Sequence, residues 1–128
     1  MKVLAIDWGL KRIGLAYGEL GFAPTLLPPL VNFKRSEIID WVAKLCLSEN
    51  IQSIIIGKPK HPLNAQKVEK LAQLLREKGL QVNLLDESLT SFEAKQRLAS
   101  AGYSKKTVEK NLDSASAAIL LEDYLSKL

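Results

Sequence analysis

The chain has 128 residues, of which 47% are hydrophobic and 25% charged, and a formal net charge of +4. This composition is typical of a folded domain and excludes a largely disordered chain, so we expect one domain over residues 1–128. The only cysteine, Cys46, and the only histidine, His61, exclude an intrachain disulfide and a cysteine-based zinc site, and they disfavour a catalytic triad. The mild positive excess favours a polyanionic partner without requiring one.

The N-terminal apolar run is short and is broken at once by Asp7, so it does not resemble a signal peptide. No stretch of the sequence has the length and hydrophobicity of a transmembrane helix. We therefore expect a cytoplasmic protein without a membrane partner.

The first third of the chain predicts a β-meander. Residues 2–6 and 13–17 are short apolar runs joined by a polar, glycine-containing turn, as in a β-hairpin. Three prolines between residues 24 and 29 indicate a loop. Residues 30–33 then predict a third strand, at an edge of the sheet.

The rest of the chain alternates between helical and strand-like patterns. Helices are expected from about Ser36 to Asn50, from about Ala65 to Lys78, from a capping box at Thr90 to Ser100, and from Asp113 onward, with strands over 53–56 and 81–85. A meander followed by right-handed crossovers predicts an α/β fold, with a mixed five-stranded sheet and helices on both faces.

Asp7 is the first candidate for a functional residue. It ends a strand that should be central, where a carboxylate must be paired, hydrogen-bonded or bound to a metal. Gly9 lets a backbone or a phosphate approach closely, and Lys11 and Arg12 bring positive charge to the same turn. The alternative is a turn aspartate that caps local N–H groups beside two solvated cations.

Three further acidic residues, at two places in the chain, are candidates by the same argument. Asp86 and Glu87 end a later strand, where the sites of α/β sheets form, and their mutual repulsion fits a bound cation. Asp113 opens the last helix, where an aspartate is also favoured for capping alone. If these acids converge they suit Mg²⁺ or Mn²⁺ and phosphodiester cleavage, but spacing alone does not show convergence.

Four segments resemble the conserved blocks of the YqgF/RuvX family of pre-16S rRNA nucleases, once labelled Holliday-junction resolvases. These blocks are IDWGLKRIG at 6–14, IIIGKP at 54–59, DESLTS at 86–91 with Ala94 after it, and DSASAAILL at 113–121 with Tyr124 and Leu125 after it. They occur in the family's order and span nearly the whole chain.

The resemblance implies an RNase H-like fold and a divalent-metal phosphodiesterase acting on structured RNA or branched DNA. Processing of the 5′ end of the 16S rRNA precursor is the leading expectation, with RNA favoured over DNA and a monomer or weak homodimer. The residues concerned are Asp7, Glu87 and Asp113 for catalysis and for Mg²⁺ or Mn²⁺, and Lys11, Arg12, Lys58 and Lys60 for the nucleic acid.

One departure from the family pattern leaves alternative functions to consider. Ser88 stands where the family usually has an arginine, so a bidentate phosphate contact is lost. The alternatives are a DNA junction resolvase with the same chemistry, and a non-catalytic RNA-binding ribosome-assembly factor on the same fold. A nucleotide clamp of the actin-like type ranks last, because the chain is too short for two lobes.

Overall fold

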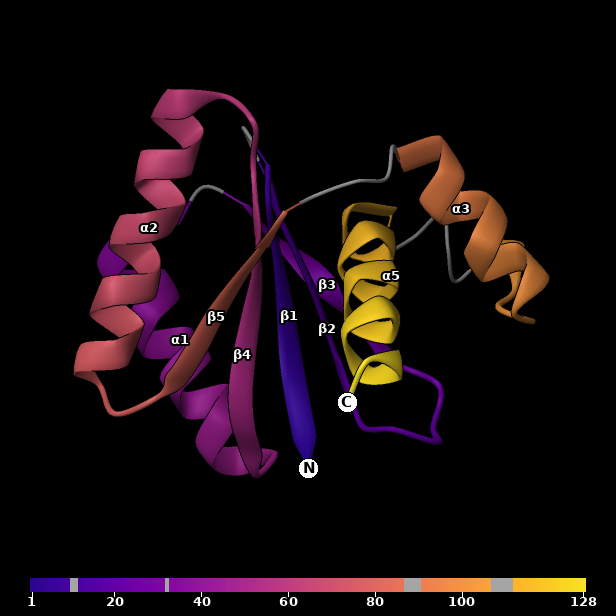
Figure 1. The fold of residues 1–128 in the computed structure, drawn as a ribbon, viewed down its shortest axis with the longest axis horizontal. Helices are drawn as coiled ribbons and strands as arrows, with labels where there is room; N and C mark the ends of the chain where they lie inside the picture. The colour runs from indigo at the N-terminus through magenta and orange to yellow at the C-terminus, as the bar shows by residue number, and fades with distance from the viewer. Residues whose placement is uncertain (10–11, 32, 87–90, 107–111) are drawn as a thin grey trace.

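The computed structural model describes residues 1–9, 12–31, 33–86, 91–106 and 112–128, with residues 91–95, 112 and 113 described through their backbone alone. One five-stranded sheet, in the order β3-β2-β1-β4-β5, runs through the molecule (Figure 1). Its strands are β1 (Lys2–Trp8), β2 (Arg12–Gly18), β3 (Thr25–Val31), β4 (Ile51–Lys58) and β5 (Gln81–Asp86). The helices are α1 (Arg35–Ser48), α2 (Pro62–Glu77), α3 (Ser91–Ser100) and α5 (Leu112–Ser126).

The predicted meander is confirmed, with one correction. β1, β2 and β3 pair antiparallel, whereas β4 and β5 join in parallel through crossover helices. The loop expected at the prolines is wrong, because Pro28 and Pro29 lie inside β3. An edge strand tolerates them, since its outer N–H groups need no partner. The β2–β3 register shifts between Ile13 and Leu15, which face this part of β3.

The predicted helices and strands of the second half are also found, with shifted ends. α2 begins at Pro62 rather than near Ala65, because proline is well suited to a first helical position. The imidazole Nδ1 of His61 caps the helix by accepting a hydrogen bond from the Leu63 N–H at 3.3 Å. The predicted capping residue Thr90 lies outside the described residues.

Helices cover both faces of the sheet, as expected. α1 and α2 pack on one face, and α5 packs on the other across β1, β2 and β3, with α3 outside it against α5 (Figure 1). The side chains of each strand alternate between the two cores. None of the described helices is long and apolar enough to cross a membrane.

The alternation of β1 shows which residues face which helices. Leu4 and Ile6 point into the core beneath α1 and α2, while Val3 and Ala5 point into the core beneath α5. The α5 core is lined by small residues of the helix, among them Ala115, Ala117 and Ala118. Because these side chains are short, α5 approaches the sheet closely.

Cys46 is buried in the core beneath α1 and should behave as an inert hydrophobe. Burial raises the pKa of its thiol from 9.0 to about 11, so the thiolate is scarce at neutral pH. We expect the native protein to resist alkylation by iodoacetamide at mildly alkaline pH and to react at once when unfolded in denaturant. Rapid labelling of the native protein, followed by mass spectrometry, would contradict this.

Candidate active site at one edge of the sheet

Asp7 lies near the C-terminal end of the central strand, on the α5 face. It follows Val3 and Ala5 in the alternation of β1, so its side chain leaves the sheet on the same side as theirs. Its carboxylate is half-buried, and none of the hydrogen bonds or ion pairs between described residues involves it. A half-buried carboxylate without such partners is costly unless a cation compensates it.

Glycines lie on both sides of Asp7 in the sheet. Asp7 is in register with Gly14 of β2 and with Gly57 of β4. Residues in register point to the same face of a sheet, so two neighbouring side chains are missing around the carboxylate. Neither neighbouring strand therefore contributes a side chain beside the Asp7 carboxylate.

The first turn of α5 is anchored at the same level of the sheet. The backbone N–H of Leu15 donates to Ser114 Oγ at 3.0 Å, and the Ser114 hydroxyl donates to the carbonyl of Leu27 at 2.5 Å. Leu15 and Leu27 are directly opposite each other in β2 and β3, and Ser114 is fully buried. The serine thus joins the two strands where their register shifts, next to Gly14, and brings the backbone of Asp113 to the edge where Asp7 lies.

Of the acidic pair that ends β5, the structure describes Asp86 and not Glu87. Asp86 is in register with Lys58, and both follow residues that point into the α1 and α2 core. Asp86 therefore faces α2, away from Asp7. The predicted roles of Glu87 and of the Asp113 side chain lie outside the described residues.

The turn after β1 brings Arg12 to the same face as Asp7. Arg12 is exposed and precedes Gly14 and Ala16 on the α5 side of β2. Its carbonyl accepts a hydrogen bond from the Gly9 N–H at 2.9 Å. Lys11, the other cation predicted in this turn, lies outside the described residues.

Gly9 is required by this turn, because a Cβ at residue 9 would lie 2.4 Å from the Arg12 carbonyl oxygen. The close approach expected at Gly9 is therefore made by the chain's own backbone. Gly9→Ala should displace the turn and lower the free energy of unfolding by roughly 1–3 kcal/mol. Thermal denaturation tests this, and an unchanged Tm would show that the turn adapts.

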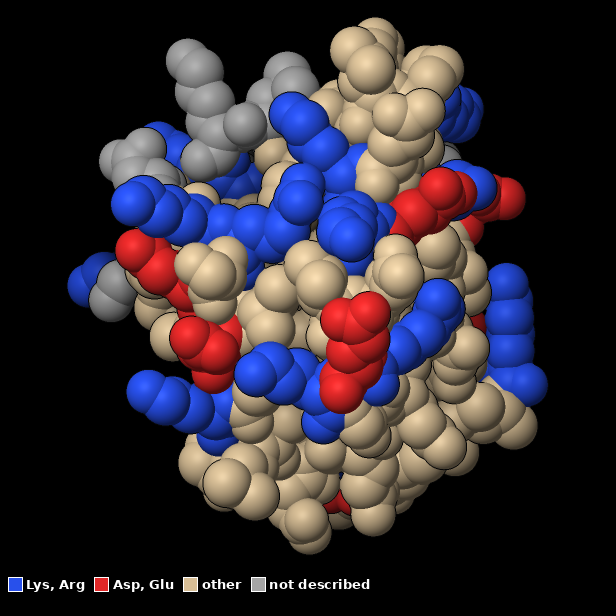
Figure 2. Space-filling model, turned by 90° about the vertical axis from the view of Figure 1, so that its left-hand side faces the viewer, with Lys and Arg blue, Asp and Glu red and all other residues tan. Residues whose placement is uncertain are grey.

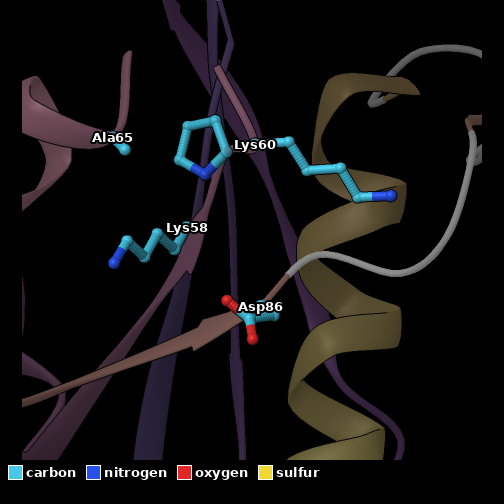
Figure 3. Close-up of a pocket in the computed structure, with 5 residues that line it drawn as sticks. Lys58, Lys60, Ala65 and Asp86 are labelled. Carbon is cyan, nitrogen blue, oxygen red and sulfur yellow. The ribbon is translucent and has the colours of Figure 1, made fainter. Parts of the chain in front are cut away.

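Lys58 and Lys60 line a cavity of about 420 Å³ between the ends of β4 and β5 and the start of α2 (Figure 3). The Lys58 ammonium group pairs with Glu69 of α2 at 3.2 Å, and both side chains are partly exposed. Such a pair is worth little, so Lys58 can exchange it for a phosphate. Lys60 extends from the loop in the opposite direction to Lys58, toward the α5 side of Figure 3.

The described part of the site fits a divalent cation, although it does not form a complete set of ligands. Within the described residues, no three His, Cys, Asp or Glu side chains come close enough to hold a metal. Asp7 supplies a carboxylate oxygen, the kind of donor that Mg²⁺ and Mn²⁺ prefer, between two glycines of the neighbouring strands. β5, which precedes Glu87, ends at the same end of the sheet as β1. α5, whose first turn contains Asp113, begins there (Figure 1).

Solved structures with the same fold include two resolvases. The fowlpox virus resolvase, in complex with Holliday junction DNA, matches with a TM-score of 0.65 and 16% identity over 99% of this chain and 98% of its own. Thermus thermophilus RuvC matches with a TM-score of 0.57 and 15% identity over 99% and 96% of the two chains. These similarities confirm the RNase H-like fold.

Sequence relatives extend over the whole chain. Proteins named "Putative pre-16S rRNA nuclease" from Opitutus terrae and from Thermus thermophilus are each 34% identical to it, over 99% of this chain and 92% and 98% of theirs. A family model described as RuvX, Holliday junction resolvase, matches residues 1–127. The chain therefore belongs to the RuvX family.

Proposed function

We propose that the protein is a divalent-metal-dependent endonuclease that cleaves phosphodiester bonds beside Asp7, at the C-terminal end of the central strand. The observation that carries the proposal is the position of Asp7, a half-buried carboxylate between two glycines that faces the anchored first turn of α5. This arrangement places a negative charge where neither neighbouring strand contributes a side chain. A protein that only binds RNA has no need of a carboxylate in that position.

In this proposal Asp7, Glu87 and Asp113 hold Mg²⁺ or Mn²⁺. When bound, such an ion lowers the pKa of a water molecule and stabilises the leaving oxygen. The protein's own cations bind and orient the substrate. Arg12 lies on the same face as Asp7, and Lys11, Lys58 and Lys60 complete a set that contacts phosphates without reading bases.

The substrate we propose is the 16S rRNA precursor, cut near its 5′ end in the cytoplasm, because the named relatives are pre-16S rRNA nucleases. A branched DNA is the second candidate, and the description of the matching family supports it. A four-way junction has two equivalent strands, so its symmetric resolution favours a two-fold dimer. Cleavage of RNA at one position is compatible with a monomer.

The test incubates the purified protein with a labelled precursor 16S rRNA fragment and with a labelled four-way DNA junction, in Mn²⁺ or in chelator. We expect cleavage of the RNA in Mn²⁺, none in chelator, and none with Asp7→Asn. Faster cleavage of the junction would favour the resolvase. Tight binding without cleavage, equal in the wild-type protein and the variant, would reject the nuclease and favour an RNA-binding assembly factor.

A further inference from the structure

The positive excess of the chain is concentrated in α2 and the loop that precedes it. Residues 58–78 contain six lysine and arginine residues and only two acidic residues, Glu69 and Glu77, which leaves a net charge of +4. This equals the net charge of the whole chain, so the other 107 residues balance. On the surface formed by α1 and α2, lysine and arginine side chains gather in a band across the upper half (Figure 2).

Two lysines of α2 are available for a partner. Lys67 and Lys70 are exposed, and neither takes part in a hydrogen bond or ion pair with another described residue. Lys67 and Lys70 are three positions apart, so they are neighbours on the surface of the helix. Glu69, which lies between them in the sequence, pairs with Lys58.

The fold holds these lysines in fixed positions relative to Asp7. The opposite side of α2, including Val68, Leu71 and Leu75, is fully buried against the sheet, so the helix cannot rotate. α2 starts at the same edge of the sheet as Asp7, but on the other face (Figure 1). Lys70 lies eight residues beyond Pro62, about 12 Å along the helix, or roughly three to four base-pair steps.

We propose that Lys67 and Lys70 bind the phosphate backbone of a double-helical arm that flanks the cleaved bond. This proposal rests on the proposed function, since it assumes that a nucleic-acid substrate is bound beside Asp7. It adds a second contact on the opposite face of the sheet, made to a different stretch of backbone. Binding by lysine ammonium groups depends on charge and not on sequence, so this contact supplies affinity and orientation.

The test measures binding by fluorescence anisotropy over a series of salt concentrations, in chelator so that no cleavage occurs. The probes are an RNA hairpin with a single-stranded 5′ extension and the same RNA with its arm trimmed to about three base pairs. The variant is Lys67→Gln/Lys70→Gln. The matched control is Lys2→Gln/Lys127→Gln, which removes the same charge at the start of β1 and just after the end of α5, outside α2.

For the long-armed probe we expect Lys67→Gln/Lys70→Gln to weaken binding by at least about tenfold near 0.1 M salt, and to reduce the slope of log K against log salt by about 1.8. The control should have little effect, and the trimmed probe should bind the variant and the wild-type protein equally. Equal losses in variant and control, or an unchanged slope, would overturn the proposal.

Failure of this proposal is distinguishable from failure of the proposed function. Cleavage in Mn²⁺ by the wild-type protein and its loss in Asp7→Asn test the function alone. If that result holds while Lys67→Gln/Lys70→Gln binds like the wild-type protein, only the α2 contact is wrong. If the wild-type protein binds neither probe, the α2 contact and the proposed function both fail.

Discussion

Asp7→Asn should lower the rate of metal-dependent cleavage by about a thousandfold or more, while the fold is kept. An amide has the same size as a carboxylate but no charge, so the substitution disturbs neither the glycine neighbours nor the strand pairing. A metal ligand in a hydrolytic site is worth several kcal/mol of barrier, and 1.4 kcal/mol corresponds to tenfold in rate. Single-turnover kinetics with the labelled RNA measures the loss.

A second measurement shows whether Asp7 acts through a metal. A ligand that binds only the folded state raises its stability, so Mn²⁺ should raise the Tm of the wild-type protein and leave that of Asp7→Asn unchanged. Asp86→Asn is the matched control. It removes a carboxylate from the same edge of the sheet, but on the α2 face, so it should keep both the rate and the response to Mn²⁺. A wild-type rate for Asp7→Asn, or an equal loss in Asp86→Asn, would contradict the assignment.

The fold was largely predictable because most of its strands and helices follow from the local pattern of apolar and polar residues. Short apolar runs predict β1 and β2, and helical spacing predicts α1 and α2. The prediction fails where local chemistry is ambiguous. Proline usually indicates a loop, and only the position of β3 at the edge of the sheet makes Pro28 and Pro29 acceptable within a strand.

The candidate site was predictable only in part, because it is assembled by pairing between distant segments. Asp7 stands out in the sequence, since a charge at the end of an apolar strand needs an explanation. The glycine neighbours do not stand out. Gly14 and Gly57 become meaningful only when the register of three strands places them beside Asp7. The sequence likewise presents Asp86 and Glu87 as one acidic pair, whereas the alternation of β5 turns Asp86 toward α2.

Within the 113–121 block, nothing in the sequence distinguished Ser114 from its neighbours. It is a small polar residue in an alanine-rich helix, where serine usually faces solvent or bonds within its own helix. Its partners, Leu15 and Leu27, are 99 and 87 positions away. They are accessible to it because the strands shift register beside the two prolines of β3. The two prolines of β3, which made the loop prediction wrong, therefore lie beside the register shift at which Ser114 attaches α5 to the strands.

Ser114→Ala should consequently be the most destabilising small substitution in this region. It removes the hydroxyl that links the Leu15 N–H to the Leu27 carbonyl, and an unsatisfied buried polar group costs about 1–3 kcal/mol. With two groups affected, we expect a loss of roughly 2–4 kcal/mol in the free energy of unfolding, and a fall in Tm of about 10 °C. Urea unfolding and calorimetry measure both.

The substitution also tests whether this anchor positions the active site. If the first turn of α5 moves away from β2, the Asp113 backbone moves with it, and the affinity for Mn²⁺ should fall while that for RNA in chelator stays the same. Ser116→Ala is the control, because it removes a hydroxyl from the same helix two residues further on. Among the described residues, Ser116 makes no hydrogen bond to a strand. A stable Ser114→Ala protein with wild-type affinity for Mn²⁺ would show that the alanine face of α5 holds the helix in place without the serine.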